Sequence, residues 1–180
     1  MVFGRLFSKG QTSRFECLYS ECESLCCRKN LVVLNEDDAA TFERLGINIA
    51  ETTKNMGLNE FLTLLGSTQI KQLDGLDVVV LKRDGDGNCV FLNSDDGGCK
   101  IYSDRPYFCR EFPFKFSKGK IKKKDLICPG IERGDEKDIS DIREELGLSG
   151  LDVKPPLLVG DESKLKTSKT LMSMVFRIMR

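Results

Sequence analysis

Eight cysteines are the residues of this sequence best suited to chemistry. The chain has 180 residues and no histidine, which excludes histidine acid–base catalysis and metal sites that contain histidine. Thiolates bind soft metal ions such as zinc, and they also hold iron–sulfur clusters. We therefore predict metal binding through the cysteines, which are Cys17, Cys22, Cys26, Cys27, Cys89, Cys99, Cys109 and Cys128.

The first four cysteines follow the pattern Cys-x4-Cys-x3-Cys-Cys. Such short spacings let one loop deliver several thiolates to one point. The adjacent pair Cys26 and Cys27 has three readings. In extended backbone the two side chains point to opposite sides, so the pair serves two metal centres, or one residue ligates while the other packs. In a tight turn, both face a single site.

The last four cysteines are widely spaced, and three of them lie at or beside expected turns. Cys99 follows Asp95-Asp96-Gly97-Gly98, and Cys128 precedes Pro129-Gly130. Turns can aim a thiolate without the constraints of a regular element. Two arrangements are open: all eight cysteines form two four-thiolate sites, or four of them form one site and the others are structural.

Two arginines flank Cys109 and are candidates for the surroundings of a metal centre. Zinc bound by four thiolates carries a net charge of about −2, and a buried charge requires compensation. Arg105 and Arg110 could supply it by donating hydrogen bonds to sulfur. The alternative is that they pair with their sequence neighbours Asp104 and Glu111.

The expected cellular compartment separates metal binding from disulfide formation. The first residues, Met1 to Gln11, contain no uninterrupted apolar core of a signal peptide. No segment approaches the roughly 18 apolar residues of a membrane span. We therefore expect a cytoplasmic location, where thiols stay reduced and are free to bind metal.

The elements that must position the cysteines suggest an α+β domain. Asn35 reads as an N-cap followed by acids, which predicts a helix that ends at Gly46. The other expected helices cover residues 58–65, 135–147 and 161–179, the last being amphipathic. The expected strands are 31–34, a hairpin of 77–82 with 89–92, and a hairpin of 112–116 with 121–127.

The domain organisation follows from these elements. Residues 1–150 are predicted to form a small metal-stapled domain of β-hairpins and flanking helices. Residues 151–180 are predicted to be a linker and a C-terminal amphipathic helix that packs on the same domain.

Several segments of the sequence resemble the YkgJ-like cysteine-cluster family, named for its CxxCxxCC motif. They are residues 15–17, 26–28, 89–92, 99–106, 109–114 and 128–131. The family's usual first motif is C-x2-C-x2-C-C, whereas this chain has gaps of four and three residues. The resemblance covers roughly residues 15–131 and implies a zinc- or iron-chelating domain with the eight cysteines as ligands.

Three functions are compatible with this pattern. The first is a metal-binding protein whose zinc or iron is mainly structural, since a closed thiolate site leaves no position for a substrate. The second is a redox protein built on an iron–sulfur cluster, such as a 4Fe-4S cluster. The third is a module related to protein methyltransferases, because the flagellin lysine-N-methylase has a similar cysteine pattern. Whether the chain is an enzyme stays open.

The partner expected from the sequence is a metal ion, and a protein partner is possible. A formal net charge of zero gives no support to nucleic-acid binding. The lysines of residues 118–124 read instead as a solvated strand edge that resists aggregation. No membrane contact is expected, and the sequence does not determine the oligomeric state.

Overall fold

The computed structural model describes residues 11–18, 21–66, 70–117, 120–151, 153–161 and 164. Its helices are α1 (Leu25–Lys29), α2 (Glu36–Arg44), α3 (Ile49–Thr52), α4 (Leu58–Leu64), α5 (Tyr107–Glu111) and α6 (Ile139–Glu145). Short 3₁₀ turns cover Lys71–Leu73 and Tyr102–Asp104. Its strands are β1 (Thr12–Phe15), β2 (Thr53–Gly57), β3 (Leu76–Leu81), β4 (Phe114–Ser117), β5 (Lys120–Lys124), β6 (Ile131–Asp138) and β7 (Leu158–Gly160).

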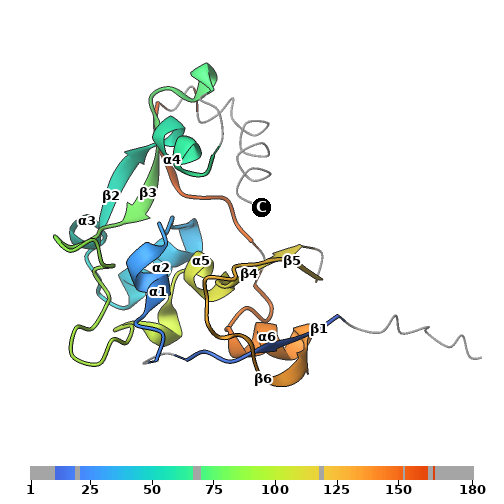
Figure 1. The fold of residues 1–180 in the computed structure, drawn as a ribbon. Helices are drawn as coiled ribbons and strands as arrows, with labels where there is room; N and C mark the ends of the chain where they lie inside the picture. The colour runs from blue at the N-terminus through green and yellow to red at the C-terminus, as the bar shows by residue number, and fades with distance from the viewer. Residues whose placement is uncertain are drawn as a thin grey trace, which may run out of the picture.

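These elements confirm the predicted α+β class. Figure 1 shows β2, β3 and α4 at one end of the molecule and β1, β6 and α6 at the other, with α1, α2 and α5 between them. The strands form one three-stranded sheet and two two-stranded sheets. Within the described part of the chain, no helix is long and apolar enough to cross a membrane.

The three-stranded sheet has β3 at its centre, with β2 on one side and β7 on the other, all antiparallel. Its face packs on α4 around a core that includes Val78, Val80 and Leu62, all fully buried. The predicted strand at 31–34 is present only as an isolated bridge between Val33 and Val80.

The prediction of a hairpin between residues 77–82 and 89–92 is wrong. The first strand forms as β3, but its two edges pair with β2 and β7. The returning segment keeps one bridge, between Arg83 and Cys89, and then turns away. Both edges of β3 are occupied by strands distant in sequence, so no edge remains for residues 89–92.

Helix α2 begins and ends as the sequence predicts. The Asn35 side chain accepts a hydrogen bond from the backbone N–H of Asp38, and the Asp38 side chain accepts one from Asn35. This reciprocal capping box satisfies two backbone donors that would otherwise be unpaired. Gly46 follows the helix with a φ of 69°, a conformation that glycine adopts without strain.

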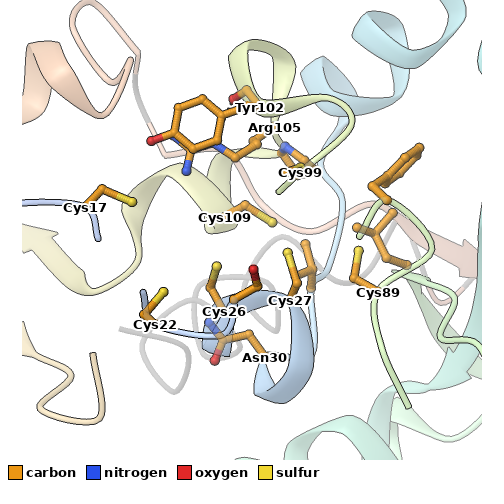
Figure 2. A pocket seen from close by; sticks show the side chains of 15 residues that line it. Cys17, Cys22, Cys26, Cys27, Asn30, Cys89, Cys99, Tyr102, Arg105 and Cys109 are labelled. Atoms are coloured by element: carbon orange, nitrogen blue, oxygen red, sulfur yellow. The ribbon is translucent and has the colours of Figure 1, made fainter. Parts of the chain in front are cut away.

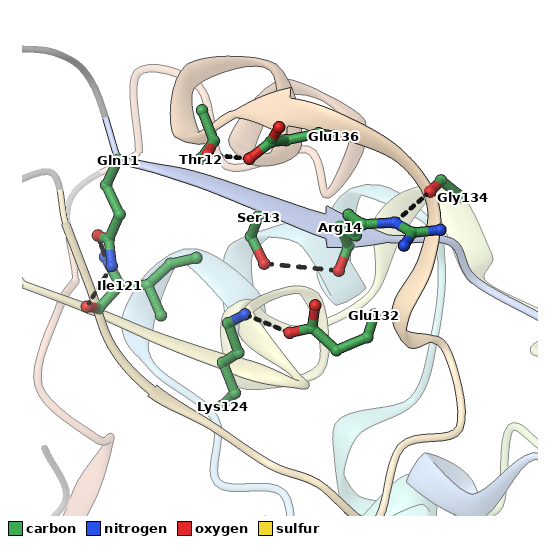
Figure 3. A network of polar contacts seen from close by, with 9 residues as sticks. All are labelled: Gln11, Thr12, Ser13, Arg14, Ile121, Lys124, Glu132, Gly134 and Glu136. Atoms are coloured by element: carbon green, nitrogen blue, oxygen red, sulfur yellow. Dashed lines mark hydrogen bonds and ion pairs between the residues drawn. The ribbon is translucent and has the colours of Figure 1, made fainter.

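The end of the molecule opposite the three-stranded sheet is built on β1 and β6, which pair antiparallel although more than a hundred residues of sequence separate them. Figure 3 shows side-chain contacts that reinforce this pairing, including Thr12 with Glu136 and the Arg14 guanidinium with the Gly134 carbonyl at 2.9 Å. The helix predicted over 135–147 is therefore only half correct. Residues up to Asp138 belong to β6, and α6 begins at Ile139.

The hairpin predicted around residues 117–119 is confirmed, with β4 paired antiparallel to β5. Gln11 joins it to the start of β1, since its amide donates to and accepts from the Ile121 backbone. The C-terminal helix predicted over 161–179 lies outside the described residues, apart from its first residue and Lys164.

Candidate metal centre

The cysteines of both sequence groups gather in two adjoining pockets between α1 and α5. Seven of them line the first pocket, together with Tyr102 and Arg105: Cys17, Cys22, Cys26, Cys27, Cys89, Cys99 and Cys109. The second pocket is lined by Cys17, Cys22, Cys26, Cys109 and Cys128. Figure 2 shows Cys22, Cys26, Cys27 and Cys89 along the lower side of the pocket, with Cys17, Cys109 and Cys99 above them. None of the eight cysteines forms a disulfide.

Helix α1 positions three of the thiols. Its first turn follows a turn over residues 21–24, in which the Leu25 N–H donates to the Cys22 carbonyl at 3.3 Å. Cys22 lies in this turn, where Glu23 and Ser24 have positive φ, and it lines the same two pockets as Cys26 of the helix. Cys26 and Cys27 are consecutive in the helix, so their side chains diverge by about 100°. The pair consequently faces two neighbouring regions of the cluster.

Backbone contacts bring Cys89 and Cys99 to Cys27. The Cys89 N–H donates to the Cys27 carbonyl at 2.9 Å. A turn then returns the chain, and Leu92 bridges Cys99. The Ser24 hydroxyl contacts the Gly97 carbonyl and fixes this turn against the start of α1. The thiols of Cys89 and Cys99 both reach the Cys27 thiol.

Helix α5 supplies Cys109 and is held by Asp38 of α2. The Asp38 carboxylate accepts a hydrogen bond of 2.8 Å from the Tyr107 N–H at the first residue of α5. Burial raises the pKa of Asp38 to about 6, although the N–H groups of Asn35 and Tyr107 and the charge of Arg110 oppose this shift. The capping box of α2 thus also positions a cysteine helix.

A close backbone contact places Cys128 beside Cys17. The Glu16 N–H donates to the Gly130 carbonyl at 3.1 Å. A Cβ added to Gly130 would lie 2.1 Å from the Glu16 carbonyl oxygen, so only glycine fits here. Next to Glu16, the ring of Phe15 packs edge to face on Phe114, with ring centroids 5.1 Å apart.

Electrostatic neighbours indicate two sets of thiols that meet at Cys26, which is a neighbour of residues in both. The pKa of Cys109 is raised well above its ordinary value, first by burial and then by the charges of Cys89, Cys26 and Cys99. The pKa of Cys128 is raised by burial and by Cys22, Cys17 and Cys26. We call Cys27, Cys89, Cys99 and Cys109 the inner group. We call Cys17, Cys22, Cys26 and Cys128 the outer group.

The thiols form a network that keeps its proton on Cys27. The pKa of Cys27 is raised above its ordinary value because its S–H hydrogen bonds to Cys26, Cys89 and Cys99. These bonds stabilise the thiolate of each partner. They lower the pKa of Cys26 to about 6 and that of Cys99 to about 7, with a further contribution from the charge of Arg105. Several thiols are therefore ready to act as anionic ligands near neutral pH.

The two candidate arginines lie in different places. Arg105 lines both cysteine pockets, and its guanidinium stacks on the Tyr102 ring at 3.8 Å from the centroid. Arg110 lines neither pocket. It donates to the carbonyls of Arg105 at 2.6 Å and Gly147 at 3.2 Å and holds the segment before α5 in place.

Arg83 and Tyr102 contribute to the site in ways that the sequence did not predict. Arg83 donates to the carbonyls of Arg28 at 2.9 Å and of Asn30, which end α1. No sequence signal marks such a role, because its partners are backbone atoms. The Tyr102 hydroxyl shares a hydrogen bond with Cys17. Its position between Cys99 and Cys109 in sequence was the available signal.

The donor set fits a soft metal ion. Eight thiols, no imidazole and an arginine beside them match the preference of zinc and iron for sulfur ligands. In the described part of the chain, no three or more Cys, Asp or Glu residues are already arranged to hold a metal ion. A metal would therefore draw neighbouring thiols together as their protons leave.

Comparison with known protein families agrees with this chemistry. A model of the CxxCxxCC family, described as "Putative zinc- or iron-chelating domain", matches residues 16–129. This range contains all eight cysteines and the helices α1, α2 and α5, whereas β1 and β6 lie outside it. Neither the curated proteins nor the solved structures contain a significant match to the chain.

Proposed function

The chain belongs to the CxxCxxCC family of zinc- or iron-chelating domains. On this basis we propose that it binds two metal ions and that these ions maintain its fold. The observation that carries the proposal is the convergence of seven cysteines on one pocket from four separate segments of the chain. Gathering several thiolates so closely is unfavourable unless a cation neutralises their charge.

We assign one ion to the inner group and one to the outer group. The Cys27 thiol is in hydrogen-bonding contact with Cys26, Cys89 and Cys99. After burial, the pKa of Cys109 is raised by Cys89, Cys26 and Cys99, so Cys26 borders the inner group. Cys128 is perturbed by Cys22, Cys17 and Cys26. The divergence of Cys26 and Cys27 on α1 supports this division, since the adjacent pair then serves two centres.

Direct thiol contacts favour single ions, with zinc as the leading candidate, over an iron–sulfur cluster. Two ligands of one tetrahedral zinc lie roughly 3.8 Å apart, given a Zn–S distance of about 2.3 Å. This separation is close to that of two hydrogen-bonded thiols such as Cys27 and Cys89. The cysteines around a 4Fe-4S cluster stand outside a core of eight atoms and are therefore further apart.

A structural role suits the position of both groups. The inner group packs against the core that contains Phe42 and Phe91, and Cys128 packs against the core around Phe114. Ions at these points would fasten α1 to α5 and β1 to the loop before β6. Arg105 would offset part of the negative charge of both centres. We place the metal-binding domain within residues 1–150 of a cytoplasmic protein.

Metal analysis of protein purified without oxygen tests this proposal. We expect a colourless protein with two zinc ions per chain by mass spectrometry of the elements, and no acid-labile sulfide. Two iron ions without sulfide would retain the two-centre arrangement and change the metal. A brown protein that contains iron and sulfide would refute the single-ion assignment. A protein that stays metal-free after zinc is supplied would refute chelation itself.

Separate substitutions of the adjacent cysteines test the division into two groups. Cys26→Ser and Cys27→Ser are each expected to retain one zinc ion. The retained zinc is then replaced with ¹¹³Cd. Scalar couplings between ¹¹³Cd and the Hβ protons of its cysteine ligands should identify different cysteines in the two variants. Loss of both ions in both variants, or of the same ion, would contradict the assignment. The C26S and C27S proteins are matched controls for one another.

A further inference from the structure

The inner and outer groups differ in their access to solvent. Cys89 is buried, at 9% exposed, and it is part of the apolar core with Phe42 and Phe91. Cys27, Cys99 and Cys109 are packed against the same core. In the outer group, Cys17 is exposed and belongs to none of the core clusters of the described residues.

The inner group is held against a packed core, of which Cys89 is a buried member, while Cys27, Cys99 and Cys109 are half-buried against it. The Cys27 carbonyl accepts the Cys89 N–H at 2.9 Å, and the guanidinium of Arg83 holds the end of α1 beside it. Phe42 is fully buried and meets Phe91 edge to face, with ring centroids 5.4 Å apart. Removal of an inner ligand therefore requires local opening of a packed core, which is costly.

The surroundings of Cys17 are more open. It follows the end of β1, where the Glu16 N–H bond to Gly130 is the neighbouring backbone contact. Its side chain meets Tyr102, whose ring is 37% exposed and carries Arg105 on one face. A ligand from solution can approach this edge of the cluster without opening the core.

We propose that the inner ion is retained and that the outer ion exchanges with solution through Cys17, which makes this protein a donor or acceptor of a thiophilic divalent cation. The inference rests on the proposed function. Exchange is a ligand substitution: an incoming donor atom bonds to the metal, the Cys17–metal bond breaks, and the Cys17 thiolate takes a proton from water. No electron is transferred. Arg105 lines the same pockets as Cys17 and favours loss of this proton when Cys17 binds the metal again.

Competition with a coloured chelator tests this inference on the zinc-loaded full chain. Excess 4-(2-pyridylazo)resorcinol should remove zinc in two phases of one equivalent each. The phases should differ at least about tenfold in rate, the ratio that a difference of roughly 1.4 kcal/mol in local opening gives. Iodoacetamide added to the same protein should label Cys17 before any inner cysteine, as read by peptide mass spectrometry.

Two variants assign the phases. Cys17→Ser should accelerate or abolish the fast phase and leave the slow one unchanged, whereas Cys99→Ser should abolish the slow phase. Two equivalents that leave at one rate, or first labelling of an inner cysteine, would overturn the inference and leave zinc binding intact. Absence of any bound zinc would instead overturn the proposed function. If Cys99→Ser does not fold, the labelling order in the unsubstituted protein decides.

Discussion

Gly130→Ala is expected to disable the outer centre selectively. The alanine Cβ would lie 2.1 Å from the Glu16 carbonyl oxygen, while contacts below 3.0 Å are essentially never seen. The two segments must therefore separate by at least 3.0 − 2.1 = 0.9 Å. Coordination distances tolerate deviations of only about 0.2 Å. A shift several times that tolerance would move Cys128 out of reach of an ion held by Cys17 and Cys22.

The measurement is zinc stoichiometry after gel filtration, followed by chelator competition. We expect Gly130→Ala to retain one tightly bound ion and to bind the second at least roughly 10-fold more weakly, the low end of the effect of disturbed metal surroundings. Gly85→Ala is the matched control, because a Cβ at Gly85 meets no atom within 4 Å. Two ions bound with unchanged affinity in Gly130→Ala would refute the role of this contact. Loss of both ions would refute the independence of the two centres.

Three further perturbations test the surroundings of the cluster. Phe42→Ala should lower the free energy of unfolding by about 3–5 kcal/mol in urea titrations, because Phe42 is fully buried against Phe91; a loss below about 1 kcal/mol would contradict its place in the core. Arg105→Met should weaken binding of both ions roughly 10-fold or more in chelator competition, since Arg105 lines both pockets; unchanged affinity would exclude charge compensation by this residue. Asp38 holds its proton in the folded state up to a pKa of about 6, against 3.8 ordinarily, so its contribution to stability is present below pH 4 and lost as the pH rises through 6. Relative to Asp38→Asn, the unfolding free energy of the unsubstituted protein should therefore fall by roughly 3 kcal/mol between pH 4 and pH 7 in urea titrations; a constant difference would contradict the raised pKa.

Local sequence signals predicted the elements whose causes are local. Asn35 and the acids after it specify the start of α2, and the capping box forms as these residues indicate. The hairpin of β4 and β5 also forms where the turn residues place it. Each of these elements is stabilised by contacts within a few residues, which are visible in the sequence itself.

The wrong predictions concern partners that are distant in sequence. Residues 89–92 have the composition of a strand, but β2 and β7 already pair with β3. The sequence predicts that residues 135–138 begin a helix, yet they belong to β6 and pair with β1, because that strand offers an unpaired edge. Composition cannot show which edge is free, since that depends on segments far away in the chain.

The cysteines show the same limit in the site itself. Their spacing suggests a compact N-terminal group and a dispersed C-terminal group. The structure instead brings Cys27 to Cys89 and Cys99, and Cys128 to the neighbourhood of Cys17 and Cys22. The signal that anticipates this exchange is the adjacent pair at 26 and 27, because neighbouring side chains diverge in any regular backbone.

The contacts between cysteines distant in sequence determine how much a bound metal would stabilise the fold. An ion shared by Cys17 and Cys128 closes a loop of 128 − 17 = 111 residues. By analogy with a disulfide, closure of a loop of about 100 residues removes chain entropy worth roughly 4.7 kcal/mol from the unfolded state. Net stabilities of domains are only about 5–15 kcal/mol. A single long-range ion can therefore supply a large share of the stability, whereas four ligands from residues 17–27 alone would close only short loops.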